Sequence, residues 1–207
     1  MKSLLKKLMF ASLASTLMTM AQPVMAAPGQ PSQDQQAQIK KVQDYLNGIR
    51  TLRANFSQDN PNGTKASGKM YLKRLGKESF GKLRLDYAPP ALIKIVANGE
   101  ILRHEDGDTK EVSEYSIDST PASFLLRHKI DFFNDLEVKK METKGEKIYL
   151  TVVRPGDDGV TLTLIFVTSP MLRLQEWTVI DGQANETHVV LENVEIGIPL
   201  DEGLFAF

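Results

Sequence analysis

Hydrophobic residues recur along the chain with two different periods, and the first of these is helical. Apolar side chains at spacings of three and four are typical of one helix face, and this set consists of Ile39, Val42, Leu46 and Ile49. Ser32, followed three residues later by Gln35, has the pattern of a capping box, which starts a helix. The sequence therefore predicts an amphipathic helix that begins after Ser32 and ends near Gly48.

After this helix the period changes to two, the period of a strand with one buried face. Leu52, Ala54 and Phe56, for example, alternate with polar residues. Segments of this kind predict about ten short strands, at residues 52–57, 66–73, 83–87, 92–97, 101–105, 110–115, 136–142, 147–153, 160–167, 172–180 and 187–194.

Turn-forming dipeptides separate these strands, and such short connections join antiparallel neighbours. Examples are Asn62-Gly63, Asn98-Gly99 and Asp181-Gly182. In the middle of the chain, Thr120 and Pro121 predict the start of a short helix through Phe124–Leu126. The expected fold class is mainly β (α+β), an antiparallel sheet curled over helices. Its concave face must be filled by side chains or left as a cavity.

The first 26 residues have the order of a secretory signal peptide. Three lysines precede a short apolar run at residues 8–20, and small residues follow, with cleavage expected after Ala26. The run is shorter than the roughly 20 residues that cross a bilayer, although a retained anchor is the alternative. We expect a signal peptide at 1–26, a disordered lead-in at 27–31 and a single soluble domain at 32–207.

Composition excludes several classes of function. The chain has no cysteine, which removes disulfides, thiolate metal sites and a lipidated N-terminal cysteine. It has 25 Lys and Arg against 26 Asp and Glu, and three of the lysines lie in the signal, so the mature chain carries a net charge of −4. Nucleic-acid-binding proteins show a basic excess instead, and we expect no nucleic-acid partner.

The sequence contains no motif of a common enzyme class. There is no G-x-S-x-G, H-E-x-x-H, P-loop or G-x-G-x-x-G pattern. His104, His128 and His188 are far apart in sequence and are typical of ordinary strand or surface histidines. We therefore predict no catalytic residues, no metal and no cofactor. A carboxylate pair assembled across strands, as in glycosidases, stays open as an alternative.

The order of several short segments resembles the outer-membrane lipoprotein carriers known as LolA. The resemblance spans nearly the whole mature chain and rests on agreement in order, since no single motif is unique to the family. Its residues are Phe56-Ser57-Gln58, Gly68, Gly81–Tyr87, Pro90, Ile95–Gly99, Thr120-Pro121, Phe124–Leu126, Leu174, Trp177, Asp181, Thr187, Leu191, Asn193, Ile198–Leu200 and Leu204-Phe205.

The resemblance implies an incomplete, strongly bent antiparallel β-barrel whose helical lid encloses an apolar cavity. It further implies a non-enzymatic, monomeric periplasmic carrier that binds the acyl chains of lipoproteins. An inner-membrane lipoprotein-releasing transporter would supply the cargo, and an acceptor at the outer membrane would receive it. The alternatives are a periplasmic lipid-binding or sensor module with the same fold, and a periplasmic hydrolase.

Alternation within the predicted strands and the lid helix selects the cavity wall. The candidates are Met70, Leu72, Leu83, Leu85, Ile95, Leu102, Phe124 and Leu125. The resemblance implies that Arg74 hydrogen-bonds the lid and holds the empty cavity shut, a role that suits a planar group with five donors. Leu75 stands where the family has a proline, and about five extra residues precede Gly81. Taken by itself, Arg74 also fits a solvated strand end.

Overall fold

A single antiparallel sheet of eleven strands dominates the computed structural model. The structure describes residues 31–74, 80–120, 123–156 and 159–207. Its elements are α1 (Gln33–Gly48), β1 (Thr51–Asp59), β2 (Lys65–Lys73), β3 (Lys82–Tyr87), β4 (Ile93–Ala97), β5 (Ile101–Asp106), β6 (Val112–Ser116), the 3-10 turn η1 (Ile117–Ser119), α2 (Ser123–Leu126), β7 (Glu137–Lys144), β8 (Lys147–Val153), β9 (Thr161–Val167), β10 (Arg173–Ile180), β11 (Glu186–Ile196) and the 3-10 turn η2 (Glu202–Phe205).

The strand order shows that the sheet is open. It runs β6-β5-β4-β3-β2-β1-β11-β10-β9-β8-β7, so the first and last strands of the chain pair at its centre. The chain moves outward by hairpins from β1 to the edge strand β6, and then crosses through η1 and α2 to the other edge strand, β7. Because this crossing must pass over the sheet, the topology itself places η1 and α2 above one of its faces. We call η1 and α2 together the lid.

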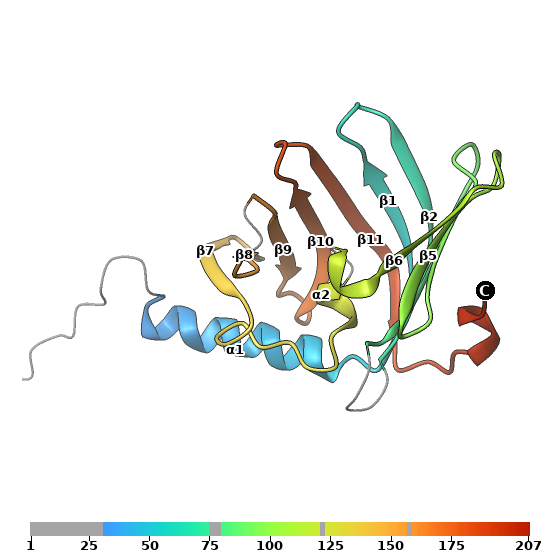
Figure 1. Cartoon of the computed structure of the whole chain (residues 1–207). Helices are drawn as coiled ribbons and strands as arrows, with labels where there is room; N and C mark the ends of the chain where they lie inside the picture. The colour runs from blue at the N-terminus through green and yellow to red at the C-terminus, as the bar shows by residue number, and fades with distance from the viewer. Residues whose placement is uncertain (1–30, 75–79, 121–122, 157–158) are drawn as a thin grey trace, which may run out of the picture. The chain divides into compact units, whose positions relative to one another are not determined.

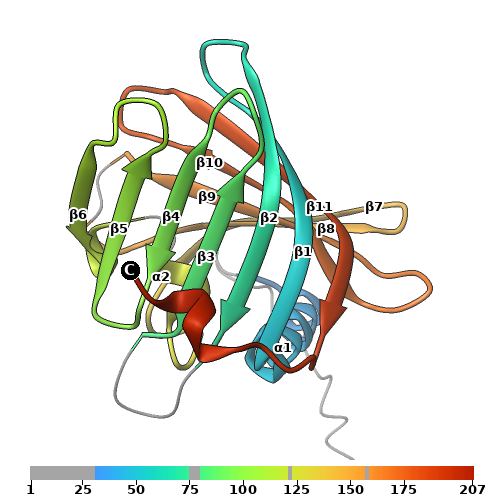
Figure 2. The same ribbon diagram turned by 90° about the vertical axis from the view of Figure 1, so that its right-hand side faces the viewer.

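Helix α1 closes one end of the curved sheet. Ser32 and Gln35 form the capping box that the sequence predicts, and the helix buries Ile39, Val42 and Leu46. Figures 1 and 2 show α1 at the end of the sheet opposite the hairpin tips, with α2 on the concave side. No helix within the described segments is long and apolar enough to cross a membrane.

The C-terminal turn η2 packs on the opposite, convex side of β3 (Figure 2). Glu202 pairs there with Lys73 and with Lys82, whose Nζ lies 2.7 Å from Oε2. Hydrogen bonds from these two lysines lower the pKa of Glu202 to about 2. The carboxylate therefore stays ionised at neutral and mildly acidic pH.

Gly68 and Phe56, two residues of the resemblance to the carrier family, pack against each other. Gly68 lies opposite Phe56 in the pairing of β1 with β2 and opposite Tyr87 in the pairing of β2 with β3. The rings of Phe56 and Tyr87 meet edge to face, with centroids 4.9 Å apart. A Cβ on Gly68 would lie 2.8 Å from the Phe56 ring and 2.2 Å from the Asp86 carbonyl oxygen. Only glycine leaves room for this arrangement.

The predicted fold class is confirmed: the molecule is mainly β, and its sheet is bent, antiparallel and unclosed. It has eleven strands where about ten were predicted; each matches one of the predicted segments, and no bound differs by more than two residues. Thr120 caps the C-terminal end of η1, where its hydroxyl donates to the Ile117 carbonyl oxygen. The predicted start of the middle helix at Pro121 falls outside the described residues, and α2 is described from Ser123. The signal peptide, most of the lead-in, Pro121 and the insertion after Arg74 lie outside the described residues.

We expect the substitution Gly68→Ala to lower the free energy of unfolding by about 2 kcal/mol, because the added methyl group must displace backbone as well as the Phe56 ring. Urea denaturation followed by circular dichroism measures this change. The matched control is Gly48→Ala, where nothing lies within 4 Å of the added carbon. That variant should be neutral or stabilised by up to about 1 kcal/mol. Equal stability of the two variants would contradict the packing described here.

Candidate functional site

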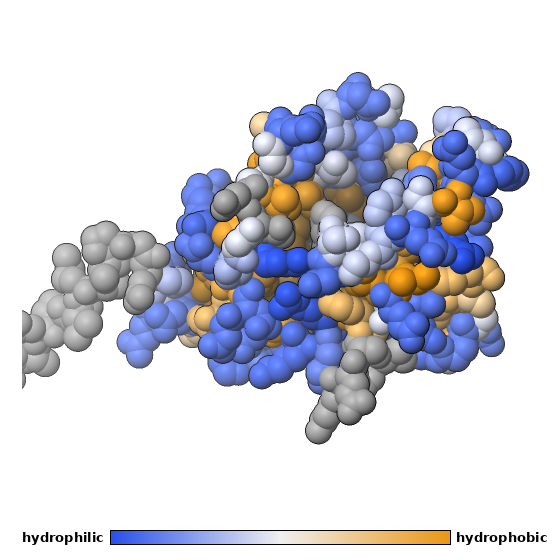
Figure 3. All heavy atoms as spheres, viewed as in Figure 1, coloured by the Kyte–Doolittle hydropathy of each residue, from blue (hydrophilic) through white to orange (hydrophobic). Residues whose placement is uncertain are grey.

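A cavity of about 520 Å³ occupies the concave face of the sheet beneath the lid. Most of its wall is apolar, and the apolar lining residues are Met70, Leu83, Leu85, Ile95, Leu102, Phe124, Leu125, Leu162, Leu164, Trp177, Val179 and Val189. Figure 3 shows hydrophobic side chains in the hollow between the hydrophilic hairpin tips. Such a wall can bind an apolar ligand without forming specific polar contacts.

Strand register explains how one half of the wall forms. Met70 pairs with Leu85, and Leu85 pairs with Ile95, which gives a continuous apolar row across β2, β3 and β4. A second row joins Leu83 through Ala97 to Leu102. Because side chains alternate between the two faces of a strand, residues in such rows all point to the same face.

The other half of the wall comes from β9, β10 and β11. Leu164 pairs with Trp177, and Trp177 pairs with Val189. Leu162 pairs in the same way with Val179. The bend in the sheet brings these rows to face those of β2–β5, so both halves of the chain line one cavity.

Seven polar residues of the described segments also line the cavity: Gln58, Tyr87, His104, Tyr115, Ser119, Thr120 and Thr187. Gln58, Tyr87, His104 and Thr187 lie near the ends of their strands, on the side of the hairpin tips. The Tyr87 hydroxyl donates to Gln58 Oε1 at 2.9 Å. These side chains can therefore face water or a polar part of a ligand, and Tyr115, Ser119 and Thr120 add polar groups from β6 and the lid.

Arg74 connects the lid to the sheet and to α1. Its Nε donates to the Leu125 carbonyl oxygen of α2 at 3.1 Å, and its Nη1 donates to the Leu46 carbonyl oxygen of α1 at 2.8 Å. The residue is only 6% exposed. Burial, and then the neighbouring charge of Arg50, lower the pKa of Arg74 to about 10. The guanidinium is therefore still protonated at neutral pH, and both hydrogen bonds come from a charged donor.

Other contacts hold the segment around the end of α2. Carbonyl groups at a helix C-terminus lack partners within the helix. The carbonyl oxygen of Leu126, the last residue of α2, accepts a hydrogen bond from the Gly81 N–H at 2.7 Å. Further along, the Asn47 side-chain amide both donates to and accepts from the backbone of Ile130, each bond being 2.9 Å long. Gln43 Oε1 accepts from the backbone N–H of Phe132 at 2.8 Å. Helix α1 thus serves as a platform for this side of the lid.

The structure brings seven of the eight predicted cavity residues together around the cavity: Met70, Leu83, Leu85, Ile95, Leu102, Phe124 and Leu125. Leu72 is not among the lining residues; it is 2% exposed and lies in the core, at the end of the sheet that α1 covers. Arg74 is buried and bonded to α2, so it is not a solvated strand end.

Sequence reasoning missed the wall formed by the second half of the sheet. Leu162 and Leu164 alternate with threonines, and Trp177 and Val179 alternate with polar residues, so the period-two signal was present. The period-two pattern shows which residues share a face of a strand, but it does not show which strands the bend of the sheet brings to the cavity. Among the described residues, no group of three His, Asp or Glu side chains could hold a metal ion.

Known proteins resemble this chain in sequence and in structure. The profile of the family described as outer membrane lipoprotein carrier protein LolA matches residues 47–207. An outer-membrane lipoprotein carrier protein from Methylococcus capsulatus is 26% identical over 189 residues, which cover 86% of this chain and 87% of that protein.

Two solved structures show the same fold at low sequence identity. A DUF1329 family protein from Desulfovibrio piger superposes with a TM-score of 0.52 at 12% identity, covering 82% of this chain and 95% of that one. A domain from Vibrio parahaemolyticus, provisionally described as an outer membrane lipoprotein-sorting protein, gives a TM-score of 0.51 at 9% identity, covering 81% and 94%.

We expect the substitution Arg74→Leu to speed hydrogen exchange at the Arg127 amide, whose N–H donates to the Ser123 carbonyl oxygen across α2. Hydrogen bonds from charged donors contribute about 1.5–3 kcal/mol, so exchange should rise roughly tenfold to a hundredfold. The control is Arg53→Leu, which removes an arginine from the half-exposed pair with Glu195. That variant should change the rate less than about twofold. Unchanged exchange in the Arg74 variant would contradict a lid-holding contact.

Proposed function

Since the chain belongs to the LolA family of outer membrane lipoprotein carriers, we propose that it is a periplasmic carrier that binds the acyl chains of lipoproteins and delivers them to the outer membrane. The observation that carries this proposal is the apolar cavity of about 520 Å³ beneath a short lid. The relatives named as lipoprotein carriers, matched over most of their length, also support it.

The cost of moving a lipid through water is the physical reason for such a carrier. Burial of one methylene is worth about 0.8 kcal/mol, so an acyl chain of about 16 carbons resists leaving a membrane by roughly 12 kcal/mol. Free diffusion between two membranes is then negligible. A cavity with an apolar wall offsets most of this cost during transit, and the polar residues in its wall keep the binding weaker than that of a membrane.

In the proposed mechanism, Arg74 holds the lid over the empty cavity. The two hydrogen bonds of its guanidinium close the lid onto α1, and the entering chain replaces the apolar contacts of α2. Moving an equilibrium from 1:99 to 99:1 takes about 5.5 kcal/mol. Burial of about seven methylenes supplies that amount, so cargo can open a lid that is firmly closed when the cavity is empty.

The proposed route starts with export through the signal peptide at residues 1–26, which would be removed near Ala26. The protein then works as a monomer in the periplasm, without metal or cofactor and without catalysing a reaction. An inner-membrane lipoprotein-releasing transporter supplies the acylated lipoprotein, and an acceptor at the outer membrane receives it. The partners follow from the family, since no described residue identifies a docking surface for either.

The single tryptophan of the chain reports on the cavity, because Trp177 lies in its wall. We expect dibromostearic acid to quench the fluorescence of the purified protein by more than about half, since bromine quenches tryptophan on contact, whereas stearic acid should not quench. Fluorescence titration measures both. Absence of quenching by the brominated acid would contradict the proposed cavity.

A pair of substitutions on neighbouring residues tests whether the concave face binds the chain. Ile95 lines the cavity, and Lys94 precedes it on the opposite face of β4. We expect Ile95→Asn to weaken binding of dibromostearic acid about tenfold, because it puts an amide against the apolar chain. Lys94→Asn introduces the same side chain outside the cavity and should leave binding unchanged. Equal effects of the two substitutions would place the lipid elsewhere.

Depletion of the protein in its own cell separates carriage from sensing. A carrier's loss should leave outer-membrane lipoproteins in the inner membrane, which fractionation and blotting of the two membranes would measure. A sensor that only recognises lipid predicts normal lipoprotein sorting after depletion, and that result would contradict the carrier role.

A further inference from the structure

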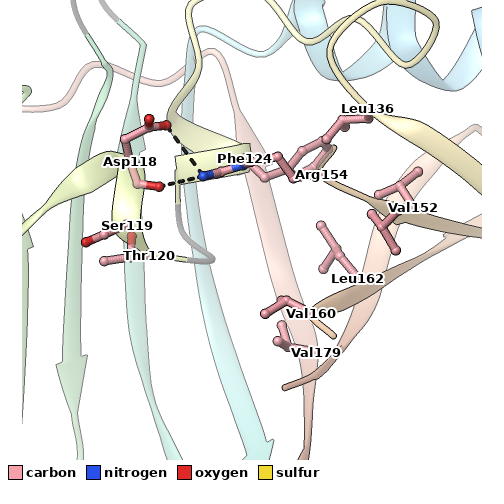
Figure 4. A pocket seen from close by; sticks show the side chains of 11 residues that line it. Asp118, Ser119, Thr120, Phe124, Leu136, Val152, Arg154, Val160, Leu162 and Val179 are labelled. Carbon is pink, nitrogen blue, oxygen red and sulfur yellow. Dashed lines mark hydrogen bonds and ion pairs between the residues drawn. The ribbon is translucent and has the colours of Figure 1, made fainter. Parts of the chain in front are cut away.

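A second arginine holds the lid from the opposite side. Arg154 follows β8, and its Nη1 donates to the Asp118 carbonyl oxygen of η1 at 2.7 Å. The same Nη1 lies 3.7 Å from Asp118 Oδ1, and Nη2 donates to the hydroxyl of Ser123, the first residue of α2. Figure 4 shows the guanidinium reaching across to Asp118 from the strands that carry Val152 and Leu162.

This contact spans the open side of the sheet. Asp118 lies in η1, directly after the edge strand β6, whereas Arg154 follows β8, the neighbour of the other edge strand, β7. Hydrogen bonds from a guanidinium are stronger than those from a neutral donor, and Ser123 is fully buried. The pair with Asp118, whose side chain is 60% exposed, adds little by itself. The backbone and hydroxyl contacts are therefore the ones that hold the lid.

A smaller hollow of about 130 Å³ lies beside Arg154. Its apolar wall includes Leu136, Val152, Val160 and Leu162 (Figure 4). We call it the side hollow. Phe124 and Leu162 line both the side hollow and the main cavity, so the two spaces are neighbours, and the lid residue Phe124 lies at their boundary.

The volumes set what each space can hold. An apolar cavity of about 150 Å³ accommodates one benzene molecule, or about 25 Å³ per carbon. On this scale the main cavity of about 520 Å³ holds about 20 carbons, which is one long acyl chain, and the side hollow of about 130 Å³ holds about five. A lipid group with two long chains therefore does not fit the main cavity alone.

We propose that the side hollow is a subsite for part of a second acyl chain, about five of its carbons, and that Arg154 is the latch that closes it while the lid is down. This inference rests on the proposed carrier function and specifies its ligand as a lipid group with more than one chain. When the contacts of Arg154 with Asp118 and Ser123 break, Phe124 can move from the boundary, and the two spaces join. The side chain of Arg154 is 26% exposed, so water can compete for its contacts.

The test compares a one-chain probe with a two-chain probe, palmitic acid and dipalmitoylglycerol, by native mass spectrometry of the full protein. Val160→Phe fills the side hollow, because Val160 lines that space and not the main cavity. We expect this substitution to raise the dissociation constant of dipalmitoylglycerol at least about tenfold and to change that of palmitic acid by less than about twofold. The matched variant Ile95→Phe narrows the main cavity and should weaken both probes.

The latch is tested separately with Arg154→Met, which keeps an unbranched stem but removes the donors. We expect the association rate of dipalmitoylglycerol to rise at least about fivefold and that of palmitic acid to change less than about twofold. Stopped-flow quenching of Trp177 fluorescence by chain-brominated analogues of both probes measures the two rates. A variant that is only less stable would show a lower midpoint in urea without this selectivity. If Arg154→Met raises the association rate of neither probe, or raises both rates equally, the proposed latch is refuted.

The outcomes distinguish this inference from the function on which it rests. If the unaltered protein binds palmitic acid and Val160→Phe leaves dipalmitoylglycerol binding unchanged, the subsite is refuted and the carrier proposal stands. If the unaltered protein binds neither probe, both proposals fall. Selective loss of the two-chain probe in Val160→Phe supports the subsite.

Discussion

The structure depends on an apolar concave face that the chain covers only in part. Eleven strands bend around this face, and rows of Leu, Ile, Met and Val from both halves of the chain point into it. Exposed apolar surface of this size is costly in water. The chain offers α1 at one end and the four-residue helix α2 in the middle as cover. In the proposed function, a fatty chain would complete the burial that the fold leaves unfinished.

The hydrogen bonds that hold the lid suit the lid movement that the proposed carrier function requires. Arg74 and Arg154 hold it from opposite sides through hydrogen bonds to backbone carbonyls and one hydroxyl. Such bonds exchange readily for bonds to water, so their net contribution is small compared with burial of a whole acyl chain. The lid also buries Ile117, Phe124 and Leu126 in the core, so an entering chain must replace these apolar contacts as well.

The sequence predicted the strands well and the cavity in part, for identifiable reasons. Alternation showed that Met70 and Leu72 point to the same face, but it could not show that Leu72 is enclosed in the core while Met70 lines the cavity. The same alternation marked Leu164 and Trp177 without showing that the bend turns them toward β3. The resemblance to the family predicted the contact of Arg74 with the lid. Arg154 was not predicted, because its partner Asp118 lies 36 residues away in the sequence. No local pattern encodes such a contact.

The most direct test of the central claim is native mass spectrometry of the protein purified from periplasm without detergent. If the concave face carries fatty chains, a fraction of the molecules should have added mass, and collisional activation should release an acylated protein or lipid as that mass is lost. The Ile95→Asn variant, purified in the same way, should show less of it. If the protein purified from cells that are making lipoproteins is found only at its own mass, the claim that its concave face carries fatty chains is contradicted.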